Sequence, residues 1–177
     1  DYAEDLVRQI DNMNRGQFLE ELIDAQSTDF CVGVAGYPEK HFESPNPTWD
    51  VLALKRKVDA GADYIVTQMF FDNRHYFDFV ERCREVGITV PIVPGLKIIT
   101  SKKHLTSLPA FFHLEIPEAL AAEVEAADRK NVSAVGIEWA RQQAQELLEG
   151  GAPALHFYIM QTAKHALQVV EPLRKMA

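Results

Sequence analysis

An alternation of short apolar runs with helical segments is the feature that most constrains the fold of this chain. An apolar strand is predicted over residues 30–36, a helix capped by Thr48 over residues 48–60, and a β-branched strand over residues 64–69. Gly61 fits the left-handed position just past the end of that helix. This alternation predicts a parallel sheet with right-handed crossovers, in which polar side chains gather at the carboxyl ends of the strands.

The remaining segments continue the pattern. The loop over residues 37–47 contains three prolines and is long for a compact domain, which favours a functional role. Helices are predicted over residues 2–13, 17–25, 74–85, 102–108, 117–127, 132–148 and 163–175, and further strands over residues 90–96 and 154–158.

Composition excludes several classes of protein. Hydrophobic residues make up 47% of the chain and charged residues 25%, as in a globular domain. A net charge of −8 argues against nucleic-acid binding, which needs a basic surface. Cys31 and Cys83 do not form a disulfide framework, and no apolar run approaches the ~18 residues that span a bilayer. We therefore expect a cytoplasmic protein with no membrane partner and no metal site.

Three ordered segments carry a resemblance to a known family. They are Tyr-Pro-Glu-Lys-His over residues 37–41, Leu-Lys-Arg-Lys-Val-Asp-Ala-Gly-Ala over residues 54–62, and Thr-Gln-Met-Phe-Phe-Asp over residues 67–72. In order and spacing they resemble the second half of the flavin-dependent methylenetetrahydrofolate reductases. The resemblance runs over nearly the whole chain.

The resemblance implies half of a (β/α)₈ (TIM) barrel, an α/β fold whose complete form has about 250 residues. The four predicted parallel strands would be strands five to eight of the parent barrel. We expect one partial barrel domain over residues 1–177, with leading helices in residues 1–29 and four strand–helix units in residues 30–177. The catalytic acid of the family lies on its first strand, so we assign no catalytic residue and expect this chain alone to be inactive.

The resemblance also implies a site for flavin adenine dinucleotide (FAD), with NADH or NADPH as reductant. Asp50 suits ribityl or ribose hydroxyls, whereas Arg56 or Lys57 suits the pyrophosphate or the electron-rich edge of the reduced flavin. Simpler interpretations stay open, since Arg56 and Lys57 could form a solvated helix face and Asp50 could only favour the helix dipole. The expected FAD-binding residues are Ala3, Tyr37, His41, Asp50, Arg56 and Lys57.

Gln68 and His104 are the expected substrate-binding residues. An amide at the end of a buried strand donates and accepts at once, which suits a pterin ring, although it also suits bonds to neighbouring backbone. His104, Leu108 and Thr162 depart from the family pattern, so the tail of a folate would be held differently here. The residues expected at the face of the barrel where the loops follow the strands are Tyr37, His41, Gln68, Lys97 and either Gln161 or Thr162.

The implied parent reaction is reduction of 5,10-methylenetetrahydrofolate to 5-methyltetrahydrofolate through bound FAD. An alternative is a non-catalytic flavin- or nucleotide-binding half-barrel that needs an N-terminal partner. A third interpretation, a phosphate-binding barrel such as an aldolase, lacks a Gly-rich phosphate loop after the last strands. Because a half-barrel leaves strand edges and an apolar face exposed, we expect self-association or pairing with the missing N-terminal half.

Overall fold

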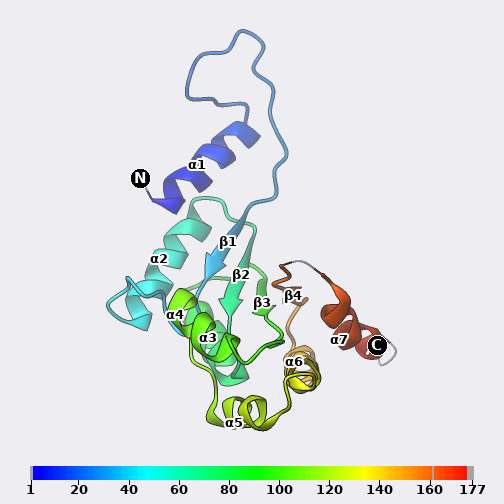
Figure 1. The fold of residues 1–177 in the computed structure, drawn as a ribbon. Helices are drawn as coiled ribbons and strands as arrows, with labels where there is room; N and C mark the ends of the chain where they lie inside the picture. Colours follow the sequence, from blue (N-terminus) through cyan, green and yellow to red (C-terminus); the bar gives the residue numbers. More distant parts are fainter. Residues whose placement is uncertain (1, 161, 175–177) are drawn as a thin grey trace.

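The computed structural model describes residues 2–160 and 162–174. Figure 1 shows a central sheet surrounded by helices, with α1 and the segment after it extending away from the sheet. The elements follow in the order α1 (Ala3–Asn14), β1 (Gly33–Gly36), α2 (Pro47–Asp59), β2 (Tyr64–Met69), α3 (Asn73–Glu85), β3 (Ile92–Leu96), α4 (His104–Phe112), α5 (Glu118–Ala126), α6 (Val132–Glu149), β4 (His156–Phe157) and α7 (Lys164–Leu173).

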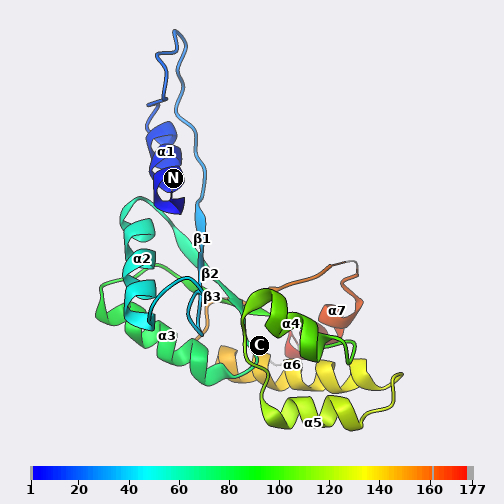
Figure 2. The same ribbon diagram turned by 60° about the vertical axis from the view of Figure 1, so that its left-hand side comes forward.

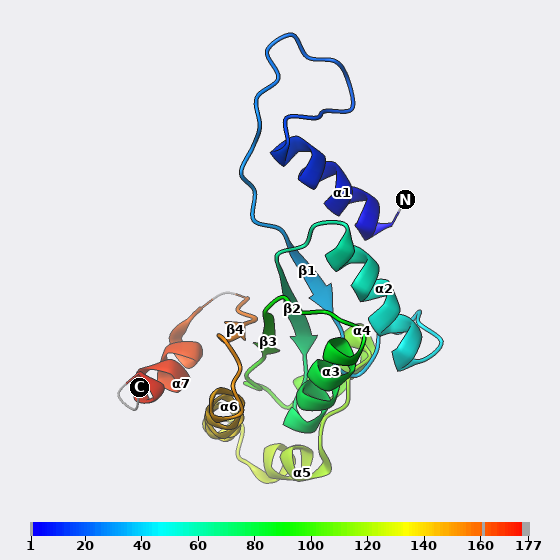
Figure 3. The ribbon, with the colours of Figure 1, turned by 180° about the vertical axis from the view of Figure 1, so that it is seen from behind.

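The sheet has the strand order β1-β2-β3-β4, and all three neighbouring pairs are parallel. Each strand therefore pairs with the next strand along the chain, as in a barrel and unlike a doubly wound sheet, where the order reverses. Helices α2 and α7 lie near opposite ends of this sheet (Figures 1 and 3). The expected α/β fold, half of a TIM barrel with four parallel strands, is confirmed.

The two faces of the sheet differ in burial. Along β2, Ile65, Thr67 and Met69 are buried, whereas the alternating residues Tyr64 and Val66 are partly exposed. The side chains of the buried face pack with apolar residues of α2, α3, α6 and α7 in the main core. Because successive side chains of a strand point to opposite faces, the other face is left open, as expected for the inner face of half a barrel.

A second, smaller apolar cluster lies beyond the sheet. It joins residues that follow β2 and β3 to the helices α4, α5 and α6, and α5 lies alongside α6 in Figure 2. Its buried members are Met69, Phe71, Ile99, Leu108, Leu114, Leu120, Val124 and Val132. This cluster supports the connections that leave the carboxyl ends of the strands.

The helix predicted over residues 17–25 is wrong, since these residues form turns and bends in a long excursion between α1 and β1 (Figures 1 and 2). Leu19 is 84% exposed and Ile23 is fully exposed, so an apolar helical face would have nothing to pack against. Short helices without tertiary packing are marginal in water, which explains why the amphipathic spacing does not produce a helix here.

The first strand and the first long helix also begin elsewhere than predicted. Strand β1 begins at Gly33 because the backbone N–H and C=O of Phe30 bond to the Asn14 side chain, both at 2.9 Å, rather than to the sheet. Helix α2 is capped by Asn46, whose side chain accepts from the Trp49 N–H at 3.0 Å. Thr48 therefore lies inside the first turn, after Pro47 at a position that tolerates proline.

The predicted helix end at Gly61 is confirmed. Its φ of +118° lies where residues with a side chain are strained. An added Cβ would also lie 2.9 Å from the Cβ of Asp11, so Gly61 lets α1 approach the end of α2.

The predicted last helix is α7, whose predicted last residue, Lys175, lies outside the described residues, as does Gln161. Within the described ranges, no helix combines the length and apolarity that crossing a membrane requires.

Candidate functional site

The carboxyl ends of the strands are flanked by two separate cavities. One, of about 570 Å³, lies between the start of α1, the end of β1 and helix α2, and we call it the β1–α2 cavity. The other, of about 210 Å³, lies beyond the ends of β3 and β4, and we call it the β3–β4 cavity. Both are where ligand sites occur in parallel α/β proteins.

The β1–α2 cavity collects every residue expected to bind FAD. These residues come from three segments that are separate in the chain: the first turn of α1, the loop after β1, and α2. The residues are Ala3, Tyr37, His41, Asp50, Arg56 and Lys57. The sequence-based set therefore forms one spatial cluster.

Asp50 holds the loop that forms one wall of this cavity. It is only 9% exposed, and its two carboxylate oxygens accept from the His41 N–H at 3.2 Å and from the Ser44 hydroxyl at 2.9 Å. Position in the first turn of α2 also favours a negative charge. The carboxylate thus organises the loop in addition to lining the cavity.

The two basic residues of α2 that line the cavity are held differently. The Lys57 ammonium donates to the Ala35 carbonyl at 2.8 Å, at the end of β1. Burial lowers the pKa of Lys57 below its usual value, and the nearby Asp50 carboxylate partly offsets this. Arg56 is exposed at the rim, where its guanidinium pairs with Glu4 of α1 at 2.7 Å.

Aromatic rings line the same wall. The His41 ring meets the Tyr37 ring edge-on at 4.5 Å between centroids, and its Nδ1 accepts from the Glu43 N–H at 3.3 Å. Burial raises the pKa of the half-buried Tyr37 hydroxyl. The sequence analysis did not identify Tyr2 and Trp49, two exposed aromatic residues that also line the cavity. The position of Trp49 next to Asp50 was the available signal.

Gln68 lies outside both cavities, in a small hollow beside Tyr37 and Glu39. Its side-chain oxygen accepts from the N–H of Met69 at 2.9 Å. Among the described residues no partner is found for its amide nitrogen, which leaves two N–H donors for a ligand. Gln68 is thus half engaged with the neighbouring backbone, as the simpler interpretation expected.

Glu39 connects this hollow to the segment between α4 and α5. One carboxylate oxygen accepts from the Glu115 N–H at 2.7 Å, and the other is buried without a partner among the described residues. Burial raises the pKa of Glu39 above its usual value.

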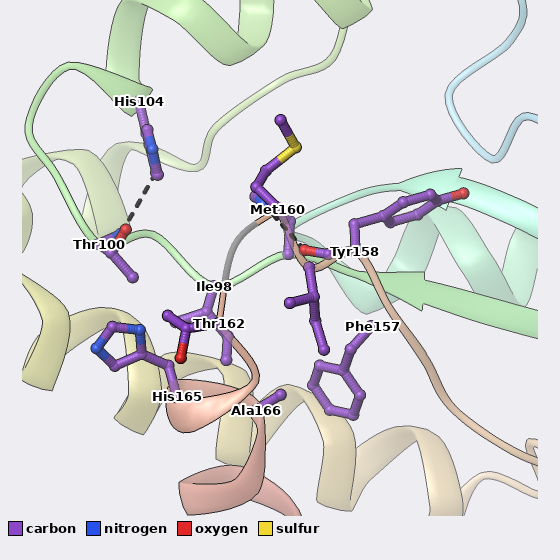
Figure 4. Close-up of a pocket in the computed structure, with 11 residues that line it drawn as sticks. Ile98, Thr100, His104, Phe157, Tyr158, Met160, Thr162, His165 and Ala166 are labelled. Carbon is purple, nitrogen blue, oxygen red and sulfur yellow. Dashed lines mark hydrogen bonds between the residues drawn. The ribbon is translucent and has the colours of Figure 1, made fainter.

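The β3–β4 cavity contains the other expected substrate residue, His104 (Figure 4). Its Nδ1 accepts from the Thr100 N–H at 3.3 Å, so its Nε2 is the nitrogen left to carry a proton. Burial and the nearby Lys97 lower the pKa of His104. The Lys97 ammonium donates to the Tyr158 carbonyl at 2.9 Å, and burial lowers its pKa.

The structure therefore separates the two expected substrate residues, because Gln68 and His104 lie in different hollows. Lys97 and Thr162 line the β3–β4 cavity, whereas Tyr37 and His41 line the β1–α2 cavity. Sequence analysis missed His165, which also lines the β3–β4 cavity. Its place in the first turn of the helix after the last strand is the signal that could have found it.

Comparison with family models matches residues 1–174 to the family described as methylenetetrahydrofolate reductase. A probable methylenetetrahydrofolate reductase (NADPH) of Caenorhabditis elegans is 35% identical over 147 residues, which are 81% of this chain and 22% of that protein. Methylenetetrahydrofolate reductase 2 of Saccharomyces cerevisiae is 32% identical over 177 residues, covering 97% of this chain and 28% of the relative. The 5,10-methylenetetrahydrofolate reductase of Salmonella typhimurium is 34% identical over 147 residues, which are 82% of this chain and 50% of that protein.

These curated relatives are longer than the chain, which spans between 22% and 50% of their lengths. One similar solved structure is described as an uncharacterized protein from Clostridium thermocellum that binds two copies of 5-methyl-5,6,7,8-tetrahydrofolic acid. It superimposes with a TM-score of 0.58 over 99% of this chain and 70% of that protein, at 20% sequence identity. At that identity the likeness supports the fold alone.

Proposed function

The chain belongs to the methylenetetrahydrofolate reductase family, and from this we propose that it forms the FAD-binding part of an enzyme that reduces 5,10-methylenetetrahydrofolate to 5-methyltetrahydrofolate. NADH or NADPH would supply the hydride. Relatives are named for each of these two nucleotides, which supports a pyridine nucleotide without selecting one.

The observation that carries the proposal is the convergence of six expected FAD-binding residues on one cavity. They are spread over positions 3 to 57, and the fold of α1, the loop after β1 and α2 brings them together. The β1–α2 cavity also occupies the end of the sheet at which barrel enzymes bind their ligands.

The residues present fit a dinucleotide. A volume of about 570 Å³ lies in the range of cofactor pockets. Arg56 and Lys57 suit the pyrophosphate, since both present N–H donors and positive charge. The exposed Trp49 and Tyr2 provide flat apolar surfaces for rings, and the small side chain of Ala53 also lines the cavity.

Bound flavin would supply the hydride-transfer chemistry, whereas the residues of this chain would bind and orient the ligands. Lys57 would present a positive charge whose position is set by the Ala35 carbonyl. Asp50 would keep the loop with Tyr37 and His41 closed over the ligand. The free amide nitrogen of Gln68 would donate to the pterin ring, and His104 would contact the substrate further along.

A second candidate function is a flavin-binding half-barrel that acts only with an N-terminal partner. The open inner face of the sheet favours this candidate, as do the outer edges of β1 and β4, which pair with no strand among the described residues. Such edges and faces promote association with another chain or with a second copy. The two candidates share the FAD site and differ only in where the remaining strands come from.

Flavin retention by the natural full-length protein tests the proposal. We expect purified protein to carry FAD, measured by its visible absorption after gel filtration, and to reduce 5,10-methylenetetrahydrofolate with NADH or NADPH. Lys57→Gln removes the charge in the cavity and is expected to weaken FAD binding about tenfold.

Lys55→Gln is the matched control. Lys55 lies on the same helix, pairs with Asp59 and does not line the cavity, so this variant should retain FAD. Equal effects of the two substitutions, or a wild-type protein that does not bind FAD, would refute the proposed site. Retention of FAD by the isolated chain, with turnover only after addition of the N-terminal half, would select the second candidate.

A further inference from the structure

A third cavity, separate from the two described above, lies beside helix α6. It has a volume of about 260 Å³ and is lined by residues 71–73 after β2, by Pro117 before α5, and by four residues on one side of α6. We call it the β2–α6 cavity. None of its lining residues lines the β1–α2 or the β3–β4 cavity, so a ligand bound here would occupy a place of its own.

Two buried side-chain acceptors of this cavity have no donor. Asn73 and Gln143 are only 6% and 5% exposed, and the Oδ1 of Asn73 and the Oε1 of Gln143 have no hydrogen-bond partner among the described residues. They are two of the four buried polar side-chain atoms without a partner in the described part of the chain. A buried acceptor left without a donor costs about 1–3 kcal/mol, so these oxygens require a donor that no described residue supplies.

The orientation of both amides is fixed by the bonds of their nitrogens. The Nδ2 of Asn73 donates to the Gln143 carbonyl at 3.0 Å and to the Oε2 of Glu146 at 2.7 Å. The Nε2 of Gln143 donates to the Phe70 carbonyl at 3.0 Å. Turning either amide over would place its oxygen against these acceptors. The groups without a partner are therefore the oxygens, and the group that satisfies them must be a donor.

The charges of the lining favour a cationic donor. Asp72 and Glu146 line the cavity, and the described lining residues include no Lys, Arg or His. The Asp72 carboxylate is already paired with the guanidinium of Arg74, at 2.9 Å between Oδ2 and Nε. Glu146 forms no ion pair with any residue that the structure describes. A donor with positive charge would therefore satisfy both the amide oxygens and the Glu146 carboxylate.

The size of the cavity and its aromatic side chains restrict the kind of cation. A volume of about 260 Å³ exceeds what one water needs by roughly an order of magnitude. Among the described residues, no three His, Cys, Asp or Glu side chains are placed to hold a metal ion. Phe71 and Trp139 supply apolar and aromatic surface, which favours an ammonium carried on an alkyl chain. Gln142 and Glu146 are exposed, so the cavity is open to solvent at these residues.

We propose that the β2–α6 cavity binds an alkylammonium group, with the Glu146 carboxylate as its charge partner and the amide oxygens of Asn73 and Gln143 as further acceptors. An ammonium has three N–H donors, which matches these three side chains. The group comes either from a free alkylamine or from the side chain of a lysine in another protein. The inference is independent of the FAD site.

Calorimetric titration of the natural full-length protein tests the site without requiring activity. At neutral pH and constant ionic strength, n-butylammonium chloride should bind, whereas 1-butanol, which has the same alkyl chain without the charge, should not. Glu146→Gln removes the charge and keeps an acceptor for Asn73, so it should weaken n-butylammonium binding about tenfold. Absence of n-butylammonium binding to wild-type protein, or equal binding of 1-butanol, would overturn the proposal.

Glu149→Gln is the matched control, because it changes the net charge by the same amount. Glu149 is exposed on the same helix, accepts from the Gln145 side chain at 2.9 Å and does not line the cavity. Its substitution should change n-butylammonium binding less than about twofold. Equal effects of the two variants would mean that only the general field of the helix matters, which would overturn the role of Glu146.

Two further ligands test the amide acceptors and the source of the group. Butyltrimethylammonium has the same chain and charge but no N–H, so it should bind about tenfold more weakly than n-butylammonium. Equal binding of these two cations would overturn the role of the Asn73 and Gln143 oxygens. Nα-acetyl-lysine amide that binds as tightly as n-butylammonium would identify a protein lysine as the source, and its exclusion would identify a free amine.

Discussion

The β1–α2 and β3–β4 regions occupy the same end of the sheet, but the residues expected in each are brought together to different extents. In the first, all six expected cofactor residues line one cavity. In the second, His104 lies apart from Gln68, and His165 was not anticipated. The first set was expected from motifs that resemble a known family and that lie mostly within one strand–loop–helix unit, whereas a site between units depends on how several helices pack.

The largest expected effect concerns the packing of the β3–β4 region. An added Cβ at Gly136 of α6 would overlap the carbonyl oxygen of Ile99, in the segment after β3. Gly136→Ala should therefore destabilise the protein by about 3 kcal/mol, measured by chemical denaturation, since the backbone must move apart. Ala134→Gly, at an exposed position of the same helix, should lower the free energy of unfolding by only about 1 kcal/mol, because glycine has a lower helix propensity than alanine. A stabilising Gly136→Ala would show that α6 does not approach Ile99 closely.

The corresponding change in the β1–α2 region is Asp50→Ala. This substitution should lower the free energy of unfolding by about 2 kcal/mol, because two partly buried hydrogen bonds to a charged group are lost. FAD retention should fall with it, since the loop carrying Tyr37 and His41 is released. Asp59→Ala serves as control, because Asp59 is exposed on the same helix and, within the described part of the chain, pairs only with Lys55. Normal FAD retention by Asp50→Ala would mean that the loop does not need the carboxylate.

A double-mutant cycle tests whether the two proposed substrate residues, Gln68 and His104, act separately. Gln68→Leu and His104→Leu should each raise KM for the folate substrate, and their free-energy effects should add within about 0.5 kcal/mol because the side chains share no hollow and no hydrogen-bond partner. A coupling energy well above that value would show that one ligand group bridges both residues directly.

The smallest effect concerns Glu39, which links the loop after β1 to the segment between α4 and α5. Burial raises its pKa above the ordinary value of 4.5, so the folded protein holds this proton more tightly than the unfolded chain. Its contribution to stability is present below pH 4.5 and is lost as the pH rises through the raised pKa. As the pH increases from 4.5, the denaturation midpoint of Glu39→Gln should therefore become higher than that of wild-type protein. The reason is that the Gln side chain keeps an acceptor for the Glu115 N–H and does not ionise. Parallel pH profiles would indicate that Glu39 is solvated.

Errors in the predicted elements have a common physical origin. Residues 17–25 have helical spacing, but the apolar side chains of Leu19, Leu22 and Ile23 are exposed, so no surface of the fold packs against them. Phe30 has a strand-like sequence, but Asn14 of α1 takes both of its backbone hydrogen-bonding groups. In each case the sequence pattern was present. The outcome was decided by whether a residue distant in the chain packed against the segment or took its hydrogen bonds.

The expected membership of the β1–α2 site followed from the family resemblance of its motifs, whereas local sequence alone determined the order of most strands and helices and the helix end at Gly61. These features depend on backbone conformation and on residues within a few turns of each other, which short-range propensities control. Only the tertiary structure decided that Gln68 and His104 lie in different hollows and that Lys97, His104 and His165 share one. Those outcomes depend on packing between elements far apart in the chain, where burial and close contact, rather than local propensity, set the free energy.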